Sequence, residues 1–206
     1  MSKVQSQASK TVSKLSAAFM DQPWTDKMFY ANYIAQTYYY IVHTTKLLQA
    51  AKDAATDPEL AECIAHHLAE ERGHEKWAQN DLKALGFDLK DFPESAVIKQ
   101  MYGDIYTGIQ KSGPAAIFGY AIALEGLSAK VCPMLAPTLH ASYGKKAATF
   151  ITSHAKIDQE HAAESFSILK FFDEAGLRVI ADHIVLTEKT YLRFLEGLPK
   201  SRHKSA

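Results

Sequence analysis

The chain has 206 residues, 47% of them hydrophobic, which is enough for one domain with a substantial core. Its 23 lysine and arginine residues balance 23 aspartate and glutamate residues, so no net charge favours binding to nucleic acid or to an anionic membrane surface. No apolar run approaches the roughly 18 residues of a membrane-spanning helix, and the start MSKVQSQASK does not resemble a signal peptide. We therefore expect a single cytoplasmic domain over residues 1–206, with Cys63 and Cys132 reduced.

Apolar residues recur every three or four positions between the few glycines and prolines, a period that indicates helices rather than strands. The chain is therefore predicted to be all-α, a compact bundle of about seven helices. In chain order, the predicted helices cover residues 4–19, 25–55, 56–85, 93–111, a segment that begins at 114, 145–174 and 177–195. The last six residues, SRHKSA, are expected to be frayed.

Local signals mark several helix ends. Thr25 is an expected N-cap of the second helix, and Thr56 with Glu59 is expected to form a capping box at the start of the third. Pro133 and Pro137 are expected to kink or end the helix that begins at residue 114.

One spacing of histidines and an acidic residue occurs twice. The two triplets are His67-x3-Glu71-x2-His74 and His154-x3-Asp158-x2-His161. On a helix that turns about 100° per residue, steps of four and seven return to within roughly 40° of the starting direction, so each triplet lines one helical face. Imidazole and carboxylate groups are ligands for iron, manganese or zinc. Two such faces turned toward each other inside a bundle predict a site for one or two metal ions.

Each triplet also has a simpler interpretation. For Glu71 and His74 taken alone, a solvated helix face is favoured, because charged residues crowd that stretch. The second triplet is the stronger signal, because Phe150, Ile151 and Ile157 suggest that its helix is buried. Its alternative interpretation is a hydrogen-bonded network in the core.

Glu125 lies in the apolar segment FGYAIALEGL, where an unpaired carboxylate facing the core would cost several kcal/mol. A metal ion would neutralise it; the alternative is that it faces water or pairs with a lysine. The candidate metal ligands are thus Glu71, His74, Glu125, His154, Asp158 and His161. Three imidazoles and three carboxylates suit iron or manganese, whereas structural zinc sites more often recruit thiolates.

Four other residues are candidates for a role in chemistry. His67 shares the face of Glu71 and could be a further ligand, a partner of a ligand or a proton carrier; we expect it to contact a ligand. His43 could face the same cavity, although a core histidine with satisfied hydrogen bonds is favoured. The phenols of Tyr40 and Tyr33 could donate an electron or a proton beside an oxygen-activating metal.

These residues resemble a known family, the heme-oxygenase-like di-iron oxidases and oxygenases, which share a helical scaffold with thiaminase II and the oxidase of pyrroloquinoline quinone synthesis. The resemblance covers most of the chain, from YANYIAQTYYYIVHTTKLLQAA through HLAEERGHEKWAQNDLKALG and YAIALEG to HAKIDQEHAAES, the most specific segment. The six candidate ligands occupy the positions of the family's ligands. The chain departs from members that take a carboxylate from the early helix, because His43, Thr44 and Thr45 stand there.

The resemblance implies a dioxygen-dependent enzyme with two iron ions, or iron and manganese, that takes electrons from an external donor. It implies a small organic substrate, such as an amine, an amino acid, a fatty acid or a side chain of the protein itself, and a homodimer. The alternatives are a metal-free oxidase or transferase on the same scaffold and a non-catalytic ligand-binding protein. Thiaminase II itself is disfavoured, because its nucleophilic cysteine precedes a tryptophan by two positions, whereas Pro133 and Met134 follow Cys132.

Overall fold

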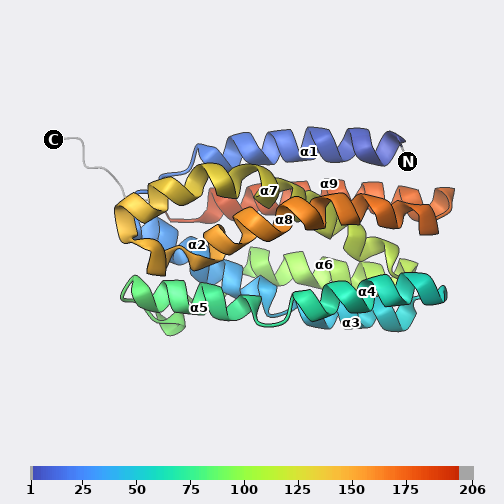
Figure 1. Ribbon diagram of the computed structural model, residues 1–206, viewed down its shortest axis with the longest axis horizontal. Helices are drawn as coiled ribbons and strands as arrows, with labels where there is room; N and C mark the ends of the chain where they lie inside the picture. Colours follow the sequence, from blue (N-terminus) through green and yellow to red (C-terminus); the bar gives the residue numbers. More distant parts are fainter. Residues whose placement is uncertain (1, 200–206) are drawn as a thin grey trace.

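A computed structural model describes residues 2–199 of the chain, and over this range it contains helices and no strand (Figure 1). The α-helices are α1 (Ser2–Met20), α2 (Lys27–Ile41), α3 (Thr44–Ala54), α4 (Pro58–Glu70), α5 (His74–Ala84), α6 (Ala96–Ser112), α7 (Ala115–Tyr143), α8 (Thr149–Ser167) and α9 (Glu174–Gly197). Three short 3-10 helices are η1 (Leu89–Asp91), η2 (Lys145–Ala147) and η3 (Ile168–Phe171). The all-α prediction is confirmed, while the predicted fraying of SRHKSA lies outside the described residues.

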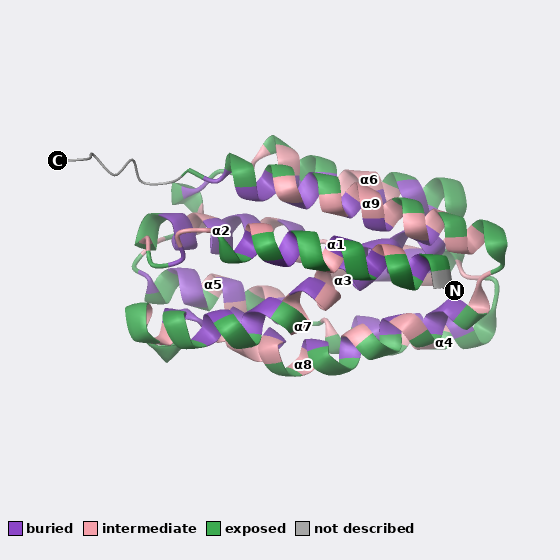
Figure 2. Cartoon of the chain, turned by 90° about the horizontal axis from the view of Figure 1, so that it is seen from above, coloured by how far each residue is buried: buried purple, intermediate pink, exposed green. Residues whose placement is uncertain are grey.

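α7 is the central helix of the bundle. It packs against α8, α9, α1 and α6, while α3 and α4 pack against each other on the side opposite α1 (Figure 1). Its first nine residues, AAIFGYAIA, are all buried, and buried residues line the inward faces of the surrounding helices (Figure 2). α7 is long and apolar enough to cross a membrane by length and composition, contrary to the sequence expectation, but 67% of its most apolar stretch is buried within the bundle.

α7 does not end at its two prolines. Pro133 has no N–H to donate to the carbonyl of Ala129 four residues earlier. The side chain of Gln159 on α8 supplies the missing donor, with Nε2 placed 2.6 Å from the Ala129 oxygen. A hydrogen bond from a neighbouring helix therefore supports the continuation of α7 to Tyr143.

Two of the seven predicted helices are each divided into two. The predicted helix over residues 25–55 is interrupted at Val42 and His43, and the predicted helix over residues 56–85 is interrupted between Glu70 and His74. Gly73 has a φ of +95°, in the left-handed region that glycine adopts most easily. A Cβ at Gly73 would meet no atom within 4 Å, so this glycine serves the backbone conformation rather than packing.

The caps that start the helices lie one residue beyond the predicted threonines. Asp26 accepts hydrogen bonds from the N–H groups of Met28 and Phe29 at the start of α2. Asp57 does the same at the start of α4 for Glu59 and Leu60. In both cases the residue after the predicted threonine is an aspartate, whose short carboxylate is an equally good acceptor for these N–H groups.

The start of α8 is capped from a distant element. The carboxylate of Asp81 on α5 accepts hydrogen bonds from the N–H groups of Thr149 and Phe150, each at 2.8 Å. Asp81 is completely buried. This contact fixes the first turn of α8 against α5 and so sets the position of His154 one turn later.

Candidate metal centre

Three helical segments supply the candidate ligands. His67 lies in the last turn of α4, Glu71 and His74 flank the break before α5, and Glu125 lies in the middle of α7. The third segment, α8, contributes three residues of one stripe. These are His154, Asp158 and His161, all of them buried. The structure therefore brings together all six predicted ligands and His67, which we call the cluster.

The carboxylate of Glu71 connects two parts of the cluster. Its Oε2 lies 3.2 Å from Nδ1 of His74, whereas its Oε1 lies 3.8 Å from Nε2 of His67 and 4.0 Å from Nδ1 of His161. The break between α4 and α5 makes this possible. The Glu71 N–H still bonds the His67 carbonyl and closes α4, while His74 begins the next helix.

The other two carboxylates face imidazoles as well. Glu125 Oε1 lies 3.2 Å from Nε2 of His67, and its Oε2 accepts a hydrogen bond of 2.6 Å from Ser165. Asp158 Oδ1 lies 3.5 Å from Nδ1 of His161. One potential donor atom from each of His67, Glu125 and His161 falls within 4.8 Å of the others.

Charges in the cluster shift several pKa values. Burial alone would raise the pKa of Glu71, but the imidazoles of His74, His67 and His154 outweigh it and lower that pKa. The contact with Asp158 is the largest cause that raises the pKa of His161, to about 9. The imidazoles thus favour the charged form of Glu71, and the contact with Asp158 favours the charged form of His161, as expected where opposite charges meet in a protected site.

Two buried nitrogen atoms in the cluster indicate a missing partner. Nδ1 of His74 and Nδ1 of His161 have no hydrogen-bond partner among the described residues, although each lies near a carboxylate. Buried polar atoms are normally satisfied. Imidazole nitrogens and carboxylates in this arrangement are the donors that iron and manganese accept, so the residues present fit a metal centre.

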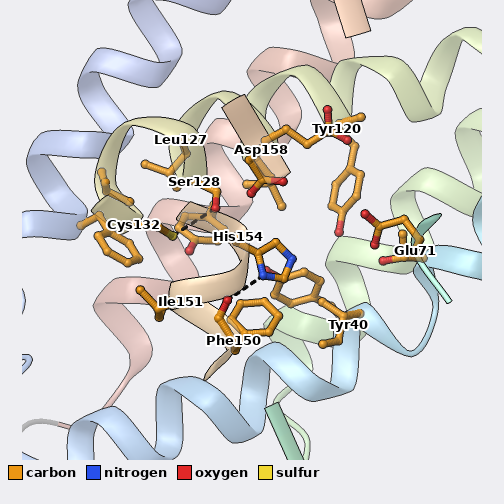
Figure 3. Close-up of a pocket in the computed structure, with 18 of the residues that line it drawn as sticks. Tyr40, Glu71, Tyr120, Leu127, Ser128, Cys132, Phe150, Ile151, His154 and Asp158 are labelled. Atoms are coloured by element: carbon orange, nitrogen blue, oxygen red, sulfur yellow. Dashed lines mark hydrogen bonds between the residues drawn. The ribbon is translucent and has the colours of Figure 1, made fainter. Parts of the chain in front are cut away.

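His154 has the tautomer that a metal ligand requires. Its Nδ1 lies 2.8 Å from the Phe150 carbonyl oxygen (Figure 3), and because a carbonyl only accepts, Nδ1 carries the proton. The lone pair is then on Nε2. Metal-binding histidines commonly donate the other N–H to a backbone carbonyl in this way. His74 packs against His154, with ring centroids 5.2 Å apart, and stacks on Trp77, whose ring also packs edge-on against His154.

A cavity opens beside the cluster, with about 770 Å³ of space between atoms, part of it open to solvent. Glu71, Glu125, His67, His154 and Asp158 form one part of its lining. The remainder is mostly apolar and includes residues of α1, α2, α7, α8 and α9 (Figure 3). Ligand sites in proteins have this mixture of an apolar wall with a few convergent polar groups.

Both predicted tyrosines line this cavity, at different places. Tyr40 lies near the cluster, packing edge-on against Tyr120 at 6.5 Å between ring centroids. Tyr33 lies farther away, where its hydroxyl is 3.3 Å from that of Tyr191. Burial raises the pKa of Tyr40 and Tyr33, so both phenols stay protonated at neutral pH.

His43 does not take the place in the cavity that the sequence left open as the less favoured of two interpretations. Its ring does not line the cavity; it stacks on Tyr102 of α6 with centroids 3.8 Å apart, and its Nδ1 lies 3.3 Å from the Tyr106 hydroxyl. The interruption between α2 and α3 at this residue turns it toward α6. His67 contacts the predicted ligands Glu125 and Glu71, as expected, and its ring lies 5.0 Å from that of His161.

Three further residues belong to the site and were not predicted. Glu70 lies 3.4 Å from Nε2 of His161, Ser165 donates to Glu125, and the Tyr120 ring extends from α7 toward Glu71 (Figure 3). Ser165 follows His161 by four residues and so lies on the same face of α8 as His154, Asp158 and His161. This spacing could have identified Ser165 from the sequence. Glu70 and Tyr120 have no such local signal.

Comparison with solved structures identifies the scaffold. A domain of unknown function with a heme oxygenase-like fold from Shewanella denitrificans OS217 is similar with a TM-score of 0.80 and 21% identity, over 92% of this chain and 89% of that chain. A TenA homolog from Pseudomonas syringae pv. tomato str. DC3000 is similar with a TM-score of 0.71 and 14% identity, over 94% of this chain and 91% of that chain. The predicted heme-oxygenase-like fold is confirmed.

The comparison of sequences identifies the family. No functionally curated protein matches the chain. A family model described as iron-containing redox enzyme matches residues 31–184, a range that contains every residue of the cluster. This match spans well over half of the 206 residues. The chain therefore belongs to the iron-containing redox enzyme family.

Proposed function

We propose that the chain is a non-heme di-iron enzyme, or one with iron and manganese, that uses dioxygen to oxidise a small organic substrate in the cavity. One observation carries the proposal: three carboxylates and four imidazoles from three separate helical segments converge beside the cavity. The two buried imidazole nitrogens without a hydrogen-bond partner give independent support.

The division of the cluster by Glu71 supports two ions. Glu71 Oε2 with His74 and His154 would hold one ion. Glu71 Oε1 faces the other set, which would hold the second ion. That set is Glu125, Asp158, His161 and, by its position, His67. Bound ferrous iron would supply the electrons that begin dioxygen reduction, and the substrate or an external donor would supply the remainder.

The protein's own groups orient this site and limit the access of water. The Phe150 carbonyl holds the His154 ring, and the Ser165 hydroxyl holds Glu125. Tyr120 and Tyr40 line the cavity beside the cluster, and both side chains are largely buried (Figure 3). Burial and the nearby Glu71 raise the pKa of Tyr120, so its hydroxyl remains a proton donor beside the site at neutral pH.

The second candidate is a metal-free oxidase or transferase on the same scaffold. The contact of His67 with Glu125 at 3.2 Å supports it, because a paired imidazole can move protons without a metal. Cysteine chemistry is a poorer candidate, since burial raises the pKa of Cys132 to about 12 and keeps its sulfur as a thiol.

Dioxygen consumption tests the proposal. Protein reconstituted anaerobically with ferrous iron is mixed with air-saturated buffer and a reductant, and uptake is followed with an oxygen electrode. We expect catalytic uptake by the wild-type chain and by His66→Ala, whose side chain is 68% exposed, and none above background by Asp158→Ala. Uptake by Asp158→Ala at the wild-type rate would contradict the proposal. Binding of an organic chromophore without iron would favour the metal-free candidate.

A further inference from the structure

The cavity beyond the cluster lacks any group that could neutralise a charge. Apart from the cluster residues, its lining consists of aliphatic, aromatic and neutral polar side chains, and no lysine or arginine lines it in the described part of the chain. Phe19, Tyr33, Val131, Cys132 and Tyr191 belong to this uncharged lining, and we call them the remote end, because Cys132 lies two turns of α7 beyond Glu125. A substrate therefore meets charged groups at one end of the cavity only.

The neutral polar groups at the remote end stay neutral. Burial raises the pKa of Cys132 to about 12, and it raises the pKa of both Tyr33 and Tyr191. The two tyrosine hydroxyls also bond each other at 3.3 Å, which leaves them little capacity to solvate an ion. Because a buried charge without a partner is strongly disfavoured, this end rejects a charged group of either sign.

The length of the uncharged part follows from the α7 helix. Glu125, Ser128 and Cys132 all line the cavity, and Glu125 and Cys132 stand seven residues apart. At 1.5 Å per residue, this separation is roughly 10 Å along the helix axis. The cavity is thus long enough for a chain of several carbon atoms that starts at the cluster.

We propose that the substrate of this site is a molecule charged at one end only, with its polar group at the cluster and an uncharged, mainly apolar remainder extending toward Cys132. This inference rests on the proposed function and specifies its substrate class. It favours amines, fatty acids and apolar amino acids over diamines, dicarboxylates and amino acids with a charged side chain.

Two probes with the same eight-carbon chain test the inference on the metal-free protein. Octylamine and 1,8-diaminooctane both present an ammonium group to the carboxylates of the cluster, and they differ in the second ammonium group that the diamine carries at the remote end. Isothermal titration of the wild-type chain is expected to give a Kd for octylamine at least about tenfold lower than for the diamine. Equal affinities, or tighter binding of the diamine, would overturn the inference.

A matched pair of variants tests where the probe lies. Ser128→Phe adds a ring within the cavity, whereas Ser142→Phe adds the same ring at an exposed position of the same helix. Octylamine binding is expected to weaken at least about tenfold in Ser128→Phe and to stay unchanged in Ser142→Phe. Wild-type affinity in a folded Ser128→Phe protein, verified by circular dichroism, would place the probe elsewhere and overturn the inference. If Ser128→Phe does not fold, the comparison of octylamine with 1,8-diaminooctane on the wild-type chain still tests the inference.

These outcomes separate the inference from the proposed function. Iron-dependent dioxygen uptake with equal binding of the two probes would retain the proposed function and reject the substrate class. Selective octylamine binding by a protein that neither binds iron nor consumes dioxygen would reject the proposed function while leaving the selectivity of the cavity in place.

Discussion

Glu71 Oε2 lies 3.2 Å from Nδ1 of His74 across an interruption between two helices. A continuous helix would also place these residues on one face, but the interruption lets Glu71 end one helix while His74 begins another. Gly73, with its φ of +95°, is the residue whose backbone makes the turn between them. The geometry of the candidate metal centre therefore depends on one glycine.

Gly73→Ala is expected to lower the free energy of unfolding by about 1–2 kcal/mol, the cost of placing a side chain in the left-handed region. No atom lies within 4 Å of the added Cβ, so the effect comes from the backbone and not from a clash. Urea denaturation measures it. Gly103→Ala is the control: Gly103 lies within α6, also with free space around it, and its replacement is expected to stabilise the protein by about 0.4–1 kcal/mol. Equal effects of both substitutions would contradict this account.

The hydrogen bond from Gln159 to the Ala129 carbonyl is expected to matter only while Pro133 is present. Gln159→Ala should cost about 1 kcal/mol in the wild-type background, because it removes the donor that replaces the missing proline N–H. In the Pro133→Ala background, the restored N–H bonds Ala129 and the same substitution should cost close to nothing. A double-mutant cycle by urea denaturation measures the coupling, and additive effects would show that Gln159 has no such role.

Local periodicity was enough to predict most of the fold and the candidate ligands. Residues 154, 158 and 161 form one helical face in any α-helix, so their convergence required only that this face turn inward. Gly73 was not recognised as an interruption, because a single glycine within a periodic pattern is compatible with a continuous helix. Nothing local could have predicted that Asp81 caps α8, since its partners lie 68 and 69 residues away. Tyr120 likewise joins the site only through the packing of α7.

Asp81 is expected to make stability depend on pH. Burial raises the pKa of its carboxyl to about 6 in the folded protein, above the ordinary value of 3.8, although the N–H groups of Phe150 and Thr149 oppose the rise. The folded state therefore retains this proton more strongly than the unfolded state, and stability present below about pH 4 is lost as the pH rises through 6. The loss is about 3 kcal/mol at 1.36 kcal/mol per pKa unit.

Asp81→Asn isolates this effect, because an amide does not titrate over this range. The Asp81→Asn variant should gain stability relative to the wild-type chain by about 2.4 kcal/mol between pH 4 and pH 7, because the unfolded carboxyl is already partly ionised at pH 4. Urea denaturation at several pH values measures the difference. The variant also loses one acceptor for the α8 N–H groups, but that cost is the same at every pH. A difference that does not change with pH would show that the Asp81 pKa is ordinary.

The two thiols are expected to differ in reactivity. Cys132 is 3% exposed, and burial raises its pKa to about 12, so almost no thiolate forms at pH 8. Cys63 on α4 is partly exposed. Ellman's reagent should therefore modify one thiol per folded chain rapidly, and mass spectrometry should locate it at Cys63. Rapid modification of Cys132 in the folded protein would contradict its buried, protonated state; in urea, both thiols should react.

Anaerobic titration with ferrous iron tests the central claim most directly. Equilibrium dialysis followed by metal analysis is expected to give close to two ions per wild-type chain and at least one fewer in Asp158→Ala and His161→Ala, while His66→Ala should retain the wild-type number. A folded wild-type protein that binds neither iron nor manganese would contradict the assignment of the cluster as a metal centre.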